Sequence, residues 1–194
     1  MVKLKKLVVA SHNTGKIAEI RELLVPFAVE VVPAADLNLP EPEETGSTFE
    51  ENALLKAFLL SKISGFPCLA DDSGLCVNAL DGHPGVYTAR YAPTPDEGMD
   101  KLLRVLKNAS DRSAYFACVL ALAWPDGKTQ TFEGRVDGDI IFEKRGKGFG
   151  YDPIFQPKGY SVTFGEMAKE EKNKISHRGR AFEKLMRAVF GQDI

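Results

Sequence analysis

The sequence lacks a long hydrophobic run, an even set of cysteines and a large excess of charge of either sign. No apolar run approaches the roughly 20 residues of a membrane-spanning helix, and the first residues carry several lysines, so we expect neither a membrane span nor a signal peptide. The three cysteines, Cys68, Cys76 and Cys118, form no C-x-x-C pair. Their number and spacing argue against a disulfide framework or a cysteine-based zinc site and favour a reducing cytoplasm.

The net charge of −2 conceals an uneven distribution along the 194 residues. Residues 1–142 hold 14 basic and 20 acidic side chains, whereas residues 143–194 hold 11 basic and 7 acidic ones. This imbalance is too weak for non-specific binding of nucleic acid, so we expect no nucleic-acid partner. It would suit a ligand that carries several phosphates together with a bound cation.

Apolar residues recur at strand-like and helix-like spacings in turn along the chain. The spacing predicts strands at residues 4–10, 29–32, 67–70, 75–77, 114–124 and 129–136, and helices at 17–24, 48–63, 99–106 and 182–189. Capping boxes are predicted at 48–51 and 163–166, and a hairpin turn at 125–127. We expect an α/β fold with a mixed, twisted β-sheet and flanking helices, in one domain over residues 1–194.

The first segment that could carry chemistry is the run Ser11, His12, Asn13, Thr14, Gly15 and Lys16, between the first strand and the first helix. A turn here would leave backbone N–H groups free at the helix start, where the helix dipole favours an anion, and Lys16 adds a positive charge. A phosphate could bind there. The alternative is a capped helix with an exposed lysine, and the segment matches neither a P-loop nor a Rossmann fingerprint.

The second segment is Asp71-Asp72-Ser73-Gly74, directly after a predicted strand. Adjacent side chains of an extended segment face opposite ways, so one carboxylate could face a ligand while the other binds local backbone donors. Mg²⁺ takes carboxylate oxygens and shares a substrate's phosphates, so one of these aspartates with Glu43 or Glu44 would form a reasonable metal site. The same four residues are equally typical of a turn.

The third segment is the glycine-rich stretch 146–153. Its glycines permit close approach of a ligand, Phe149 offers a stacking face for a nucleobase, and Asp152 can accept hydrogen bonds from a sugar or base. The alternative is a loop whose phenylalanine folds into the core.

The fourth segment, residues 169–178, has the mixed charge of a solvated helix. It ends in Ser176, His177 and Arg178 at the predicted start of the next helix. Cationic groups at that end of a helix oppose the helix dipole, which suggests that His177 and Arg178 serve an anion or a carbonyl-bearing ligand.

Seven motifs follow one another along the chain: S-H-N-T-G-K at 11–16, E-E-T-G at 43–46, F-E-E-N-A-L-L-K-A at 49–57, A-D-D-S-G-L at 70–75, G-H-P-G-V-Y-T-A-R-Y at 82–91, G-F-G-Y-D-P at 148–153 and S-H-R-G at 176–179. Together they resemble the inosine triphosphate pyrophosphatase family, also called the Ham1-like family. The resemblance covers essentially the whole chain. Its one departure is Ser11, where the family often has threonine, and the hydroxyl is kept.

The resemblance implies Mg²⁺-dependent hydrolysis of ITP, dITP and XTP to the nucleoside monophosphate and pyrophosphate. It also implies a homodimer whose subunits form two lobes around a central cleft. Asp72 would be the general base and a metal ligand, with Glu43 as its metal partner and Glu44 as the competing choice. The substrate-binding residues would be Ser11, His12, Asn13, Thr14, Gly15, Lys16 and Lys172 for the triphosphate, Ser73 beside it, and Phe149, Gly150, Tyr151, Asp152, His177 and Arg178 for the nucleoside.

Two other functions remain as alternatives. A Maf-like nucleotide pyrophosphatase would act on other modified nucleotides, although the His177-Arg178 pair argues against it. A non-catalytic regulator would bind the nucleotide without consuming it, although the carboxylates Glu43 and Asp72 disfavour that function.

Overall fold

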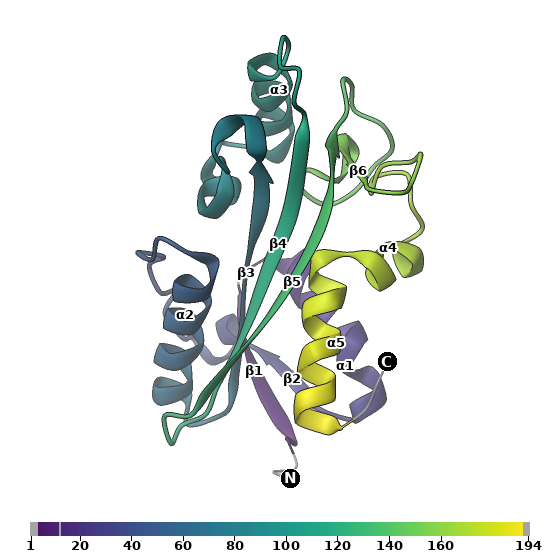
Figure 1. Ribbon diagram of the computed structural model, residues 1–194. Helices are drawn as coiled ribbons and strands as arrows, with labels where there is room; N and C mark the ends of the chain where they lie inside the picture. The colour runs from purple at the N-terminus through teal and green to yellow at the C-terminus, as the bar shows by residue number, and fades with distance from the viewer. Residues whose placement is uncertain (1–3, 12, 192–194) are drawn as a thin grey trace. The chain divides into compact units, whose positions relative to one another are not determined.

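The computed structural model describes residues 4–11 and 13–191. In these residues six strands form one sheet in the order β2-β1-β3-β4-β5-β6 (Figure 1). The strands are β1 (Lys6–Ala10), β2 (Glu30–Pro33), β3 (Cys68–Val77), β4 (Ser113–Ala123), β5 (Thr129–Ile140) and β6 (Phe155–Pro157). The helices are α1 (Thr14–Leu24), α2 (Phe49–Ser64), α3 (Pro95–Val105), α4 (Lys169–Ile175) and α5 (His177–Phe190).

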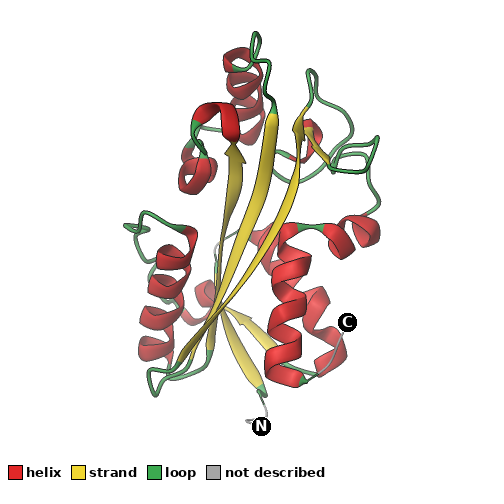
Figure 2. Cartoon of the chain, viewed as in Figure 1, coloured by secondary structure: helices red, strands yellow, loops and turns green. Residues whose placement is uncertain are grey.

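The sheet mixes parallel and antiparallel pairs. Strand β1 pairs in parallel with both β2 and β3, whereas β6 pairs antiparallel with β5. A tight turn joins β4 to β5, closed by the Trp124 N–H donating to the Lys128 carbonyl at 2.9 Å. The mixed α/β sheet with flanking helices that the sequence predicts is therefore confirmed (Figure 2).

The chain divides into two compact units. The first unit comprises Met1–Asp72, Val119–Glu133 and Ala181–Ile194, and the second comprises Ser73–Cys118 and Gly134–Arg180. The chain passes from the first unit to the second between Asp72 and Ser73, within strand β3.

Small residues let helix α2 pack closely on the strands of the first unit. Ala53 and Ala57 of α2 are fully buried, as are the facing Cys68 and Ala70 of β3. Alanine side chains bring a helix backbone near a sheet, so the polar residues beside them on α2 are carried close to β3. In Figure 1, α2 lies on one side of these strands and α1 on the other.

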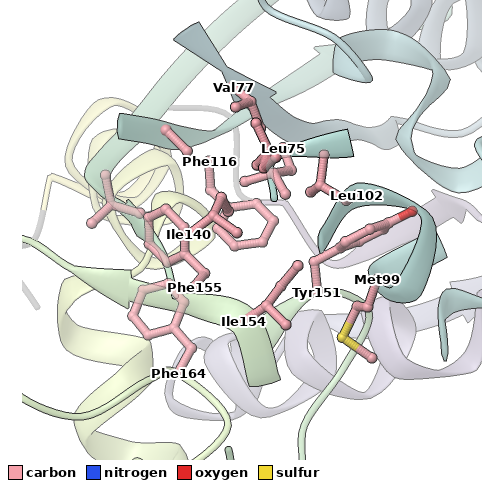
Figure 3. Packing of buried hydrophobic residues seen from close by; sticks show 13 residues of the cluster. Leu75, Val77, Met99, Leu102, Phe116, Ile140, Tyr151, Ile154, Phe155 and Phe164 are labelled. Carbon is pink, nitrogen blue, oxygen red and sulfur yellow. The ribbon is translucent and has the colours of Figure 1, made fainter. Parts of the chain in front are cut away.

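Aromatic and aliphatic side chains fill the core of the second unit (Figure 3). Phe116 of β4 packs against Phe155 with ring centroids 4.7 Å apart. Tyr151 belongs to this core and is 4% exposed. The resemblance places Tyr151 among the substrate-binding residues, and the structure buries its ring among the apolar side chains of this core.

Most predicted elements are found, with two corrections. The predicted strands 67–70 and 75–77 form one continuous strand, β3, so residues 71–74 lie within a strand and not in a turn. The motif at 163–166 begins no helix: the Thr163 N–H donates to Glu166 Oε2 at 2.8 Å and closes a turn, and α4 begins only at Lys169. In the described residues, no helix has the length and apolar character needed to cross a membrane.

Candidate active site

Strand β3 places two adjacent carboxylates in the interior of the protein. Asp71 is 2% and Asp72 is 5% exposed. Because successive side chains of a strand point to opposite faces, the two aspartates have different neighbours. The sequence predicts that one carboxylate faces a ligand while the other binds local backbone donors; in the structure Asp71 pairs with Lys16, and both aspartates lie within β3 and not after a strand.

Asp71 binds the lysine at the start of helix α1. Lys16 Nζ lies 2.5 Å from Asp71 Oδ1, and the Asp71 side chain is fully buried. Asn13 caps the helix, and its side chain accepts from the N–H groups of Gly15 and Lys16 at 3.0 and 3.2 Å. These two N–H groups are thus already engaged, contrary to the sequence prediction that they are open to an anion.

The other residues of this turn are partly accessible. Ser11 Oγ accepts from the Asn13 N–H at 3.1 Å, and Thr14 is exposed. His12, which the sequence analysis also assigns to substrate binding, lies outside the described residues.

Lys56 of helix α2 links the second carboxylate to the loop that precedes the helix. Its Nζ atom lies 2.6 Å from Glu44 Oε1, 3.1 Å from the Asp71 carbonyl oxygen and 3.7 Å from Asp72 Oδ1. The side chain of Lys56 is only 10% exposed. A buried ammonium needs such partners, since desolvation without them would favour its neutral form.

Asp72 retains an oxygen that these neighbours do not satisfy. Its Oδ2 atom is buried and has no hydrogen-bond partner among the described residues. The pKa of Asp72 is raised from 3.8 to about 6, chiefly by burial and also by Glu44, against the lowering effects of Lys56, Lys16 and Asn52. A buried, partly satisfied carboxylate of this kind is typical of a group that binds a cation or handles a proton.

The geometry favours Glu44 over Glu43 as the partner of Asp72. Glu44 is bound to Lys56 and acts electrostatically on Asp72, whereas Glu43 is exposed. The sequence favours Glu43 instead, whereas the contact of Glu44 with Lys56 and the lower exposure of Glu44 favour Glu44. In the described part of the chain no three His, Cys, Asp or Glu side chains form a ready-made metal cluster. Two carboxylates suit Mg²⁺, which keeps several waters and shares the oxygens of phosphates.

The glycine-rich loop of the second unit presents Phe149 to solvent. This ring is 43% exposed, which excludes the alternative that it folds into the core. The Phe149 N–H donates to Asp152 Oδ2 at 2.8 Å. Gly148 has no room for a side chain, since a Cβ there would lie 2.7 Å from the Asp152 carboxylate, and Gly150 adopts a φ of 61° that favours glycine.

Asp152 also binds Lys172. The side chain of Asp152 is 4% exposed, and its Oδ2 atom accepts from Lys172 Nζ at 2.6 Å in addition to the Phe149 N–H. One carboxylate oxygen thus fixes both the aromatic loop and a lysine that sequence reasoning assigns to the triphosphate.

The start of helix α5 places His177 and Arg178 in buried positions of the same unit. They are 6% and 4% exposed. The His177 ring stacks on Phe116 with centroids 4.8 Å apart and an interplanar angle of 12°. Arg178 Nη2 donates to Ser73 Oγ at 3.1 Å. A buried guanidinium keeps its charge, and its fork of N–H groups suits a planar acceptor.

The model of the Ham1 family matches residues 7–188. The chain belongs to the Ham1 family. It is 50% identical to a dITP/XTP pyrophosphatase of Agrobacterium fabrum over 94% of both chains, and 53% identical to one of Caulobacter vibrioides over 95% of this chain and 98% of that protein. A Ham1 protein of Coxiella burnetii has a solved structure that covers 97% of this chain and is itself covered completely, with a TM-score of 0.90 and 43% identity.

Two residues of this Ham1 chain were given no role by sequence reasoning. Lys56 and Asn52 both lie in the motif at residues 49–57, one helical turn apart, and both are buried. Polar residues at i and i+4 amid alanines and leucines of a capped helix could have revealed them, because that spacing puts both on one helix face.

Proposed function

We propose that this chain hydrolyses the non-canonical purine nucleotides ITP, dITP and XTP to the nucleoside monophosphate and pyrophosphate, with Mg²⁺ as cofactor. The observation that carries the proposal is the buried Asp72, with its unsatisfied Oδ2 atom, beside Glu44 and Lys56 in a Ham1 protein. Removal of deaminated purines from the nucleotide pool would follow from this activity.

Residues of the first unit would act on the triphosphate. Asp72 and Glu44 would hold Mg²⁺, which when bound neutralises phosphate charge and makes water a better nucleophile. Asp72 is also the proposed general base, since a carboxylate whose pKa is raised toward neutrality accepts a proton more readily. Lys16 and the turn at residues 11–15 would bind the phosphates, and Asp71 holds the Lys16 ammonium in place.

Residues of the second unit would bind the nucleoside. Phe149 would stack on the purine through its exposed face. Hypoxanthine and xanthine carry an oxygen acceptor at C6 where adenine carries an amino donor, so donors from Arg178 or His177 would be left unsatisfied by adenine. Lys172 would contribute to phosphate binding and Ser73 would lie beside the phosphates, while Asp152 and the Gly150-Tyr151 backbone complete the loop.

The resemblance to the family also supports a homodimer of one-domain, two-lobed subunits in the cytoplasm. The three cysteines are buried and form no disulfide. Light scattering of the purified protein tests the dimer directly.

A substrate panel tests the activity. The purified protein is incubated with ITP, dITP, XTP, GTP and ATP, with Mg²⁺ or with a chelator, and pyrophosphate is separated from phosphate. We expect pyrophosphate from the first three nucleotides only, and only with Mg²⁺. Release of phosphate would point to a different bond, and a rise in melting temperature without turnover would indicate the non-catalytic regulator.

Neighbouring glutamates provide a matched test of the metal ligands. Glu44→Gln should lower kcat/KM for ITP by about 100-fold, because it removes a charge that would bind the metal, whereas Glu43→Gln should stay within about 2-fold of the parent protein. Steady-state kinetics at several Mg²⁺ concentrations distinguish the two. A larger loss for Glu43→Gln would restore the assignment made from the sequence.

A further inference from the structure

Asn52 is a buried amide in the first turns of helix α2. It is fully buried and lies one helical turn before Lys56, so the two polar side chains share one face of the helix. Lys56 binds the side chain of Glu44. Asn52 binds the backbone of the same loop, since its Oδ1 atom accepts from the Gly46 N–H at 2.8 Å.

The contact between Asn52 and Gly46 leaves no space for a side chain on the loop. A Cβ at residue 46 would lie 2.7 Å from Asn52 Oδ1 and 2.7 Å from the Cβ of Glu51. Glu51 also holds this loop, because its Oε2 atom accepts from the Ser47 N–H at 2.7 Å and the Ser47 hydroxyl at 2.8 Å. Because Gly46 has no side chain, helix α2 can approach the loop closely and hold it at a point two residues beyond Glu44.

The other end of the Asn52 amide is committed to no neighbour in the described residues. Asn52 Nδ2 is buried without a hydrogen-bond partner, as is Asp72 Oδ2. Lys56, four residues further along the same face of α2, lies 3.7 Å from Asp72 Oδ1, so this face of the helix is turned toward Asp72, and the Asn52 amide also lowers the pKa of Asp72. A buried amide destabilises the fold unless both its oxygen and its nitrogen make hydrogen bonds. Asn52 uses its oxygen to bind the loop and keeps its nitrogen near Asp72, which indicates that Asn52 and Asp72 act together.

We propose that Asn52 is a positioning residue that holds the Glu44 loop beside the Asp72 carboxylate, so that the two carboxylates keep one arrangement for a divalent cation. The proposal rests on the proposed function in taking Glu44 and Asp72 as the metal ligands. Lys56 fixes the position of the Glu44 side chain, and Asn52 fixes the backbone of the loop that contains Glu44. Groups that orient metal ligands in this way affect metal affinity without touching the metal.

The test measures Mn²⁺ binding by electron paramagnetic resonance, without nucleotide, in the parent protein and in Asn52→Ala. We expect the dissociation constant for Mn²⁺ to rise about 10-fold or more, in the range found when groups that orient metal ligands are removed. The Mg²⁺ concentration that half-saturates ITP turnover should rise by a similar factor, while KM for ITP at saturating Mg²⁺ stays nearly constant.

A second variant and a control separate positioning from general stability. Gly46→Ala keeps the amide but pushes the loop away from it, so it should weaken Mn²⁺ binding in the same direction, and it decides the matter if Asn52→Ala fails to fold. Ser61→Ala is the control: Ser61 is a fully buried polar residue of the same helix whose hydroxyl donates to the Phe58 carbonyl at 2.9 Å. It should lower the melting temperature without changing Mn²⁺ affinity.

The outcomes distinguish this proposal from the proposed function. Unchanged Mn²⁺ affinity in Asn52→Ala or Gly46→Ala, an equal loss in Ser61→Ala, or no Mn²⁺ binding by the parent protein would each overturn the positioning role. A parent protein that binds Mn²⁺ but releases no pyrophosphate from ITP would overturn the proposed function alone, because the comparison of Mn²⁺ affinities needs no nucleotide.

Discussion

Replacing Asp72 with asparagine should nearly abolish turnover and yet stabilise the metal-free protein at neutral pH. The side chain keeps its shape but loses the charge that would bind Mg²⁺ and accept a proton. We expect kcat for ITP to fall by about 1,000-fold or more, as when a metal ligand and a general base are lost together. Steady-state pyrophosphate release measures this loss, and turnover near that of the parent protein would remove Asp72 from the mechanism.

The expected gain in stability follows from the raised pKa of Asp72. In the folded protein the pKa is about 6 instead of 3.8, chiefly because burial disfavours the charged form. Between these values the folded state binds more protons than the unfolded state, so the free energy of unfolding decreases as pH rises from about 4 to about 6. Above pH 6 Asp72 is charged in both states, and its burial lowers the free energy of unfolding by roughly 2–3 kcal/mol, the value that corresponds to a pKa shift of this size.

Thermal denaturation in the presence of a chelator shows whether Asp72→Asn stabilises or destabilises the protein. Asp72→Asn should melt at a higher temperature than the parent protein at pH 8, and the difference should shrink toward pH 4.5. The chelator is needed because a bound cation would stabilise the parent protein alone. Asp71→Asn is the matched control, since it removes the partner of Lys16 and should destabilise the fold. Equal behaviour of the two variants would contradict the environment described for Asp72.

Local features of the fold could be predicted because neighbouring residues determine them. The capping box of Thr48 and Glu51 is present at the start of α2, since its hydrogen bonds need only four consecutive residues. Residues 71–74 have good turn chemistry and nevertheless form part of β3, because pairing with neighbouring strands outweighs local preference. The strands that pair with β3 lie far from it in the sequence, so local sequence patterns do not reveal this pairing.

The site shows the same limit. Motif matching finds Asp72, but the choice between Glu43 and Glu44 depends on which of them reaches Lys56, twelve residues further along the chain from Glu44. Tyr151 lies in a binding motif, yet its ring lies in the core beside Gly98, where a Cβ would collide with its hydroxyl. Spacing along the chain identifies candidate residues, and packing between distant segments decides which side chains face a ligand.

Arg178 should determine the discrimination between ITP and ATP. Its guanidinium is buried, and Nη2 donates to Ser73 Oγ, which fixes the direction of the remaining N–H groups. Lysine would keep the charge but lose the planar fork, so it could contact Ser73 or a base oxygen but not both in one geometry. The loss should therefore fall on selectivity more than on catalysis.

For Arg178→Lys we expect the ratio of kcat/KM for ITP to kcat/KM for ATP to fall by about 10- to 100-fold, because a site built around a donor discriminates through the group left unsatisfied. Arg180→Lys is the matched control on the same helix: Arg180 is exposed, its Nη1 donates to the Arg135 carbonyl at 2.7 Å, and the ratio should not change. If Arg178→Lys discriminates as well as the parent protein, then His177 or backbone N–H groups read the base, and the buried guanidinium serves only to hold β3 and α5 together through Ser73.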